Sequence, residues 1–339
     1  MQPHINIPLK NYLTMQIGGP ADQMVDAHTP DELAQAITEA TQQGIPHYII
    51  GGGSNVIAHD EGFRGRVIRN RIGGFEVVAA DSTSTTIKIG GGENWDEVVK
   101  RTVEMNLSGI EALSGIPGTA GAAPVQNIGA YGQEVAETLV ELDAYDSQDD
   151  AMVTLKNEQC GFSYRHSIFR GTAAGRYAIC SITLRLYTSL PQPPFYAPIQ
   201  AYFDEHEISL ITPQEVRTAT LAIRTNKLPD PAQRPNSGSF FKNSIVDTWL
   251  VDELLQRFPA MPHYDMGDGT QKIPTGWLIE QTGLKGQLLH GMRVHDKNCL
   301  VLINESARGY SDLAAARDEI ATAVRDMFRI SIVQEPLEL

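Results

Sequence analysis

The sequence predicts an α+β protein, with a strand-rich part over residues 1–190 and a smaller mixed part after it. Two observations favour this fold class. Up to residue 190 the chain consists mostly of short β-branched or apolar runs between Gly-rich or Asp/Ser turns, with only two stretches of helical period. A proline-rich stretch, 188–200, then marks a boundary loop, and helical patterns dominate beyond it.

The first part begins as an alternation of strand and helix. Strands are predicted at 21–27, 46–50, 64–70, 74–80, 85–92, 138–146, 151–155 and 176–187. The first helix starts in the capping box Thr29-Pro30-Asp31-Glu32 and ends before Gly44. A second helix is predicted over 95–106, because its apolar residues share one face. These residues are Trp95, Val98, Val99, Thr102 and Val103. The small-residue span 114–132 has neither period.

The second part is mainly helical. Thr212-Pro213-Gln214-Glu215 repeats the capping signature and begins a helix that runs to about Asn226. Further helices are predicted at 247–258, 274–283 and 311–328, with a strand at 299–304. The tail 329–336 is predicted to be a final strand, in which Ile330 and Ile332 point to one face and anchor it.

Charge and composition exclude several classes of protein. The 339 residues include 27 basic and 41 acidic side chains, and the formal net charge of −14 disfavours a nucleic-acid partner. No apolar run of about 18 residues and no signal-peptide layout occur, so we expect a cytoplasmic protein without a membrane partner. The cysteines Cys160, Cys180 and Cys299 match no disulfide or zinc pattern and are predicted to be buried thiols.

Several common catalytic motifs are absent. Val56 stands where the dinucleotide fingerprint needs a third glycine after the run 51–53. The sequence has no P-loop, no metalloprotease His-Glu-x-x-His and no Gly-x-Ser-x-Gly elbow. The nine histidines show no ligand spacing, so we expect neither a metal site nor a catalytic histidine.

Two glycine-rich loops remain as candidates for a binding site. The run 51–55, Gly-Gly-Gly-Ser-Asn, exposes adjacent backbone N–H groups of the kind that hold phosphate oxygens. The run 116–124 carries small residues past a point where a flat or bulky group could lie. Either loop alone could be a turn at the end of a strand, but together they favour a cofactor cradle.

The segment after the second loop narrows the family. Residues 125–132, VQNIGAYG, place amide side chains and a tyrosine where a heterocyclic ring needs donors and acceptors. With IIGGGSNVI, LSGIPGTAGAAPVQNIGAYG, CGFSYRHSIF, RTNKLPDP and NSGSFFKN, the chain closely resembles the family of UDP-N-acetylenolpyruvoylglucosamine reductases, flavin enzymes of peptidoglycan precursor synthesis. The resemblance covers nearly the whole chain.

The resemblance implies the fold and the cofactors. It implies a two-part FAD-binding domain of the vanillyl-alcohol-oxidase type over 1–190, split near 70, and an α+β substrate-binding domain over 200–328. The tail 329–339 is expected to return as a strand to the FAD-binding half. NADPH is expected to reduce the flavin, which passes hydride to the enolpyruvyl group of the UDP-sugar. We expect a monomer.

Site residues are implied by position. The expected contacts of FAD are Gly51, Gly52, Gly53, Ser54, Asn55, Val56, Ile116, Pro117, Gly118, Gln126, Asn127, Gly129 and Tyr131. Ala122 and Ala123 stand where some members have serine, so a hydroxyl contact to FAD must be absent or replaced there. Tyr164, Tyr196, Arg224, Lys227 and Asn243 are expected to bind the substrate, whose diphosphate and carboxylate need local cations.

Three residues match the catalytic positions of the family. Arg165 would stabilise charge that develops on the substrate carboxylate, and Ser239 would protonate the adjacent carbon. Glu335 matches the carboxyl partner, with Glu338 as a weaker alternative. Ser237 is the better candidate for a serine that only caps backbone in a turn.

Two other functions stay open at this point. A flavin oxidase of the same superfamily would need the glycine loops but not the set Arg165, Ser239 and Glu335. A nucleotide-binding regulator that kept the fold would not need to retain all three residues.

Overall fold

The computed structural model describes all of residues 1–339, which form two compact units. Unit 1 contains Met1–Ile7, Ala21–Gly53 and Arg64–Thr225. Unit 2 contains Pro8–Pro20, Ser54–Phe63 and Asn226–Leu339. The chain therefore enters unit 2 twice before its main segment begins. The functional domain bounds expected from the sequence stay a prediction, and residues 200–225 lie in unit 1.

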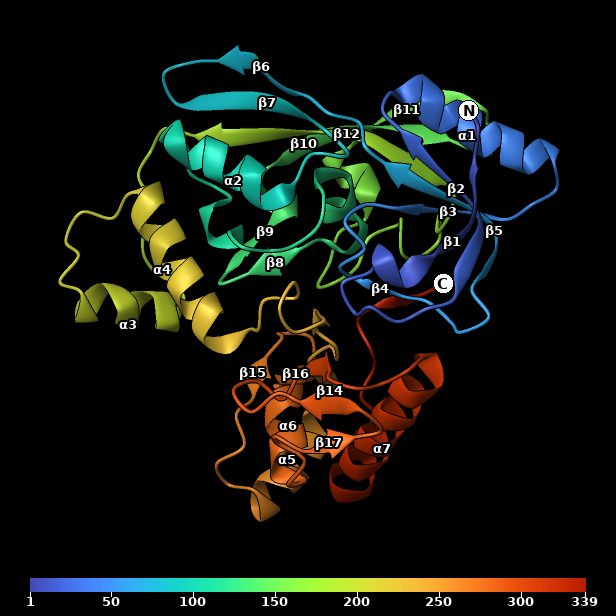
Figure 1. The fold of residues 1–339 in the computed structure, drawn as a ribbon. Helices are drawn as coiled ribbons and strands as arrows, with labels where there is room; N and C mark the ends of the chain where they lie inside the picture. The colour runs from blue at the N-terminus through green and yellow to red at the C-terminus, as the bar shows by residue number, and fades with distance from the viewer. The chain divides into compact units, whose positions relative to one another are not determined.

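Unit 1 has two sheets (Figure 1). The smaller sheet has the order β1(His4–Pro8), β2(Pro20–Ala27), β5(Phe63–Asn70), β3(His47–Ile50), with β3 and β5 parallel. The larger, antiparallel sheet has the order β11(Ala151–Lys156), β10(Leu139–Asp146), β12(Tyr177–Tyr187), β7(Ser84–Gly90), β6(Phe75–Ala80). All strands predicted from the sequence in this part are present, and β1 was not predicted.

Helices cover the larger sheet from both faces. Helix α1(Pro30–Gln42) packs against β10 and β12. Helix α2(Trp95–Glu104) buries its apolar face in a second core, which contains residues of β7 and further residues of β12. The five residues predicted to share one face of α2 are its five buried residues. Strand β12 has the longest continuous run of buried residues among the strands, from 178 to 184, because both of its faces are covered.

The threonine N-cap of each predicted capping signature is confirmed. The Thr29 hydroxyl accepts the Glu32 N–H at 3.2 Å at the start of α1. The Thr212 hydroxyl accepts the Glu215 N–H at 3.2 Å at the start of α4(Pro213–Lys227). The proline-rich stretch 188–200 is not a loop throughout, because α3(Ala197–Glu205) begins within it. A proline in the first helical turn leaves no intrahelical hydrogen bond unmade, so this one starts α3 rather than preventing it.

Short elements complete unit 1. The 3₁₀ helices are η2(Glu111–Leu113), η3(Ala120–Gln126), η4(Val135–Glu137) and η5(Asn157–Cys160), and a small hairpin joins β8(Gly129–Ala130) to β9(Gln133–Glu134). The span 114–132, which has no clear period in the sequence, therefore consists of turns, a 3₁₀ helix and the start of a hairpin.

Unit 2 has three helices on small sheets. The helices are α5(Thr248–Arg257), α6(Thr275–Gln281) and α7(Tyr310–Phe328), and the 3₁₀ helix η1(Leu9–Asn11) lies in the first inserted segment. One sheet has the order β13(Asn236–Ser239), β19(Val301–Asn304), β18(Met292–Val294), β17(Leu288–Leu289), and the other has the order β14(Ser244–Asp247), β16(Thr270–Ile273), β15(Tyr264–Asp265). The three helices were predicted from the sequence.

The tail corrects one prediction. Residues 329–336 do not form a strand; Gln334 makes a single bridge with Phe241, and the strand lies later, at β20(Leu337–Glu338). Strand β20 pairs in parallel with β4(Val56–Ile57), immediately after the first glycine loop. The predicted burial of Ile330 and Ile332 is confirmed, because both lie in the core of unit 2 while Val333 is 59% exposed; docking of the tail against the FAD-binding half stays a prediction.

Two further expectations can be compared with the structure. All three cysteines are free and buried, as predicted, and burial raises the pKa of each thiol to about 11. None of the helices is long and apolar enough to span a lipid bilayer.

Candidate active site

The two glycine loops lie against each other in unit 1. A side-chain carbon at Gly51 would lie 2.2 Å from the hydroxyl oxygen of Thr119, and one at Gly52 would lie 3.0 Å from Cα of Gly118. A side chain at either position would therefore require Thr119 or the second loop to shift. The loops therefore present backbone, not side chains, along one edge, as a binding site for a phosphate-containing cofactor requires.

The N-terminus of α2 holds the second loop in place. The backbone N–H of Trp95 donates to the Gly118 carbonyl at 3.1 Å, and its indole N–H donates to the Leu113 carbonyl at 3.1 Å. The Asp96 carboxylate accepts the Gly115 N–H at 2.6 Å. Helix α2 thus binds the second loop at Gly118 and the chain just before the loop at Leu113 and Gly115.

Three predicted site residues have a strained backbone, and two of them lie in the segment directly after η3. Asn127, Tyr131 and Arg165 all have positive φ angles, of 46°, 51° and 52°. Non-glycine residues rarely adopt this conformation, and it concentrates at functional sites. The Arg165 guanidinium donates to the Gly129 carbonyl at 2.7 Å, so this segment fixes the side chain of Arg165.

The side chain of Asn127 is used within the protein. Its amide N–H groups donate to Glu134 at 2.6 Å and to the Ser163 carbonyl at 3.2 Å, and its oxygen accepts the Ala136 N–H at 3.1 Å. Both amide N–H groups of Asn127 are therefore used within the protein, and neither is left to donate to a cofactor. Sequence reasoning missed Glu134, because a glutamate in a polar hairpin carries no signal of its partner.

Three other predicted residues come together beside this segment. The rings of Tyr131 and Tyr196 meet edge to face, with centroids 5.7 Å apart, and the Tyr131 hydroxyl is hydrogen-bonded to Arg224. Burial raises the pKa of the Tyr131 phenol, and the positive charge of Arg224 acts against that shift. Burial also lowers the pKa of the Arg224 guanidinium. A cation held among aromatic rings at this place suits an anionic ligand.

In unit 2, Ser239 lies at an irregular strand end. Strand β13 pairs Ser239 with Val301 and Asn236 with Ile303, and the register shifts between the two pairs. Gly238 has a φ of 72°, and the Asn236 side chain accepts its N–H at 2.8 Å. Such bulges redirect side chains next to active sites.

Ser237 does not have the capping role expected of it. Its hydroxyl is buried and makes no hydrogen bond, whereas the cap of the turn comes from Asn236. The correction has a simple cause, because asparagine competes well with serine for hydrogen bonds to backbone two residues later.

The tail places Glu335 beside the strand of Ser239. The Glu335 N–H donates to the Phe240 carbonyl at 2.8 Å, and the Lys242 N–H donates to the Val333 carbonyl at 2.9 Å. Further along, the Leu337 N–H donates to the Asn55 carbonyl at 3.0 Å. The tail thus joins two predicted site segments within unit 2.

Glu338 has different surroundings. Its carboxylate accepts Arg317 at 2.8 Å, Tyr310 at 2.9 Å and Gln334 at 3.0 Å, and it lies 3.3 Å from His59. Burial acts to raise the pKa of Glu338, but these hydrogen bonds and the charge of Arg317 outweigh it and lower the pKa. A carboxylate held in this way anchors the tail.

The other three residues that were expected to bind the substrate are Asn243, Lys227 and Tyr164. Asn243 accepts the Thr275 N–H at the start of α6 at 3.2 Å. Lys227 is exposed at the last residue of α4, one turn beyond Arg224. The Tyr164 ring lies under the guanidinium of its neighbour Arg165, at 5.4 Å.

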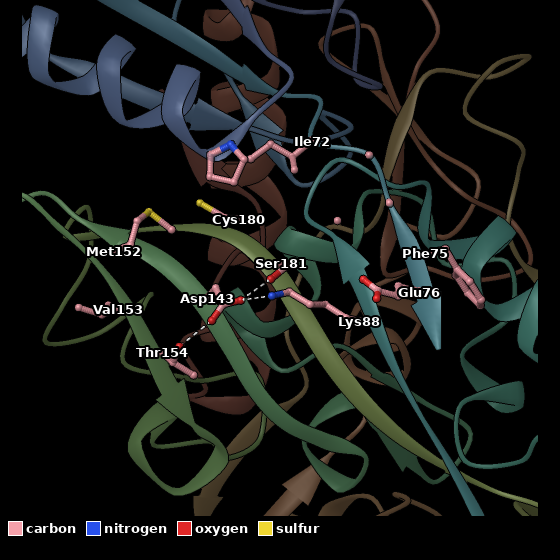
Figure 2. Close-up of a pocket in the computed structure, with 14 residues that line it drawn as sticks. Ile72, Phe75, Glu76, Lys88, Asp143, Met152, Val153, Thr154, Cys180 and Ser181 are labelled. Carbon is pink, nitrogen blue, oxygen red and sulfur yellow. Dashed lines mark hydrogen bonds and ion pairs between the residues drawn. The ribbon is translucent and has the colours of Figure 1, made fainter. Parts of the chain in front are cut away.

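A separate hollow of about 480 Å³ opens beside the larger sheet of unit 1. Figure 2 shows that the polar groups in it bind one another: Asp143 contacts Lys88 at 2.7 Å, and also Thr154 and Ser181. No residue of either glycine loop lines it. We therefore do not assign the cofactor to this hollow.

Two family models match the chain. The model described as an FAD binding domain matches residues 21–156, and the model described as the C-terminal domain of UDP-N-acetylenolpyruvoylglucosamine reductase matches residues 230–338. Among solved structures, the UDP-N-acetylenolpyruvylglucosamine reductase of Thermus caldophilus covers 100% of this chain and 99% of its own, with a TM-score of 0.65 at 23% identity. The predicted α+β fold is confirmed, and the first part of the chain matches an FAD-binding domain.

Curated relatives match along the full length. The UDP-N-acetylenolpyruvoylglucosamine reductase of Ralstonia nicotianae is 38% identical over 340 residues, which is 99% of this chain and 98% of the relative. The reductase of the same name from Dechloromonas aromatica is 36% identical over 342 residues, with complete coverage of both. The chain belongs to the UDP-N-acetylenolpyruvoylglucosamine reductase family.

Proposed function

We propose that the protein uses FAD and NADPH to reduce UDP-N-acetylglucosamine enolpyruvate to UDP-N-acetylmuramate, a step of peptidoglycan precursor synthesis. One observation carries the proposal: reductases of this name match the chain over essentially its whole length, and residues 230–338 match the model of the C-terminal domain of the same reductase. A flavin oxidase would share only the FAD-binding half.

The glycine loops fit FAD. Backbone N–H groups of Gly51 to Val56 would hold its pyrophosphate, because no side chain obstructs them at 51–53. Residues 116–118, with Gln126, Asn127, Gly129 and Tyr131, would flank the rest of the cofactor. When bound, FAD accepts hydride from NADPH and supplies it to the vinyl carbon of the substrate.

Arg165 would stabilise the charge that this reaction produces. An enol ether is electron-rich, and negative charge collects on its carboxylate when hydride adds to the terminal carbon. The guanidinium of Arg165, held in place by the Gly129 carbonyl, is organised before the charge appears. Preorganised charge that acts on the transition state is usually the largest catalytic contribution.

Ser239 would give the proton that completes the reduction. Its hydroxyl is a weak acid, but a positioned hydroxyl can protonate a carbanion that it touches. Glu335 would be its carboxyl partner, and the Glu335–Phe240 backbone hydrogen bond at 2.8 Å supports this by keeping the two residues on adjacent segments. The mechanistic roles of all three residues are part of the proposal.

The substrate would be held by cations and aromatic rings. Arg224 and Lys227, one turn apart on α4, suit the diphosphate, and Tyr196 would cover the nucleotide beside Tyr131. Tyr164 and Asn243 complete the proposed set. We also infer that the enzyme works as a monomer in the cytoplasm, where NADPH is the usual reductant, and size-exclusion chromatography with light scattering tests the oligomeric state.

The proposal is tested by visible spectra under anaerobic conditions. The purified protein should be yellow, lose its flavin absorbance on addition of NADPH, and regain it on addition of the enolpyruvyl UDP-sugar. Reoxidation by oxygen but not by the UDP-sugar would overturn the proposal in favour of an oxidase. A colourless protein that takes up no added FAD would overturn the flavin assignment itself.

A further inference from the structure

Asp96 joins two parts of the proposed site that are far apart in sequence. It lies in the first turn of α2, and one of its oxygens accepts the Gly115 N–H at 2.6 Å. The same carboxylate accepts two hydrogen bonds from Arg217 on α4, at 2.6 and 3.0 Å. A single side chain thus connects Gly115, the residue before the second glycine loop, with the helix that carries Arg224.

The pair is largely shielded from solvent. The Arg217 side chain is 9% exposed and that of Asp96 is 31% exposed. Burial acts to raise the pKa of Asp96, but hydrogen bonds from Arg217 and Gly115 and the charges of Arg217 and Arg224 outweigh it and lower the pKa. Bidentate, charge-assisted hydrogen bonds of this kind fix orientation as well as distance.

Arg224 lies against the same loop. A side-chain carbon at Gly115 would lie 3.0 Å from Nε of Arg224 and 3.0 Å from a methyl carbon of Leu221. Arg224 is two turns beyond Arg217 on α4, and its guanidinium is bonded to Tyr131. The position of α4 relative to residue 115 therefore decides where the Arg224 guanidinium lies.

We propose that Asp96 is a positioning residue, which through Gly115 sets the shape of the FAD loop and through Arg217 sets the position of Arg224 for the substrate. The substrate half of this inference rests on the function proposed above. The flavin half rests only on FAD binding by the glycine loops.

Three variants separate the two connections. Arg217→Met keeps the length of the side chain but removes the connection to α4, and it leaves the Asp96–Gly115 hydrogen bond. Asp96→Asn keeps an oxygen for Gly115 but loses the charge and the paired acceptors for Arg217. Asp96→Ala removes both connections. FAD dissociation constants, kcat and KM for the enolpyruvyl UDP-sugar are measured for each.

The expected results differ between the variants. Arg217→Met and Asp96→Asn should raise KM about tenfold, the size expected for a lost charge-assisted hydrogen bond, with FAD affinity near wild type. Asp96→Ala should raise KM similarly and also weaken FAD binding about tenfold. In the double variant Arg217→Met/Arg224→Met, KM should rise no further than in Arg224→Met, because Arg217 acts through Arg224.

A matched control is available in the same unit. Arg176 makes a bidentate ion pair with Asp146, through contacts of 2.5 and 2.9 Å, and neither residue belongs to a glycine loop. Arg176→Met removes a pair of the same kind, so it reports how a general loss of stability affects kinetics. Its KM and FAD affinity should equal those of the wild type, and thermal melting of all variants shows that each is folded.

Three outcomes would overturn the proposal. The first is a rise of KM in Arg217→Met no larger than that in Arg176→Met. The second is that the effects of Arg217→Met and Arg224→Met on KM multiply independently in the double variant. The third is that Asp96→Ala binds FAD with the affinity of the wild type. Failure of the proposed function is distinguishable, because it appears as a wild-type protein that does not reduce the UDP-sugar. The FAD measurements on Asp96→Ala and Arg217→Met then still decide the flavin half.

Discussion

The backbone N–H of Glu335 donates to the carbonyl of Phe240 at 2.8 Å, and this hydrogen bond places the C-terminal tail next to the residue that follows Ser239. The tail is held there at both ends. Ile330 and Ile332 are buried before it, and the parallel pair of β20 with β4 follows it. Terminal residues are usually poorly ordered unless tied down in this way, so the tail is structured where the proposed chemistry needs it.

Glu335→Gln should impair only the reduction of the UDP-sugar. The substitution keeps volume and the backbone hydrogen bond but removes the ionisable carboxyl. FAD content, thermal stability and flavin reduction by NADPH should stay near wild type, and reoxidation by the UDP-sugar should slow at least about 10²-fold. Stopped-flow absorbance of the two half-reactions checks this. Normal turnover would show that the carboxyl has no part in the chemistry.

Ser239→Ala should separate the same two half-reactions. We expect reduction by NADPH to stay near normal and reoxidation by the UDP-sugar to slow by a factor of at least about 10², the usual contribution of a positioned acid. Ser237→Ala is the matched control, because its hydroxyl is buried in the same strand without a hydrogen bond. Equal slowing of both half-reactions in Ser239→Ala would mean that Ser239 is structural.

Much of the fold follows from local patterns in the sequence. The capping boxes at Thr29 and Thr212 and the apolar face of α2 are signals within a few residues, so the helices that they start were predicted almost to the residue. The strand expected at 329–336 failed for a different reason. Alternating apolar residues predict an extended chain, but a strand also needs a neighbouring strand to pair with. Within 329–336 the structure has only one bridge, at Gln334, and continuous pairing begins at residue 337.

The sequence predicted the site residues that belong to recognisable motifs, but not the residues that are defined only by their contacts in the folded protein. The glycine loops are visible as sequence, and their mutual approach at Gly51 and Thr119 is a result of folding. Asp96 and Arg217 are ordinary charged residues of two amphipathic helices, 121 positions apart, and only tertiary structure pairs them. The contrast between Glu335 and Glu338 likewise depends on partners from α7 and on His59.

Gly51→Ala should weaken FAD binding. The new methyl group would lie 2.2 Å from the Thr119 hydroxyl oxygen, so the Thr119 side chain or its loop must shift. We expect the FAD dissociation constant to rise about tenfold or more, measured by flavin fluorescence. Thr119→Ala should partly rescue Gly51→Ala by removing that oxygen. Gly73→Ala, where the nearest atom is 3.4 Å away, is the control. Equal losses of FAD affinity in Gly51→Ala and Gly73→Ala would contradict the proposal that the glycine loops hold FAD.

Glu338→Gln tests the anchor of the tail through the pH dependence of stability. Because the folded protein lowers the pKa of Glu338, the carboxylate contributes stability above its ordinary pKa of 4.5, and this contribution is lost as the pH falls through the lower folded value. The free energy of unfolding in urea should therefore be about 1 kcal/mol lower in the variant at pH 7, and the difference should shrink below pH 4.5.

Glu319→Gln is the control. Glu319 lies on α7 and forms an exposed ion pair with His290, so its substitution should change the free energy of unfolding little at either pH. From the sequence alone, Glu338 was only a weaker catalytic candidate, whereas its contacts with Arg317, Tyr310 and Gln334 now predict a loss of stability with turnover per folded enzyme close to wild type. A variant as stable as the wild type at pH 7 but with greatly reduced turnover would reverse the roles of Glu338 and Glu335.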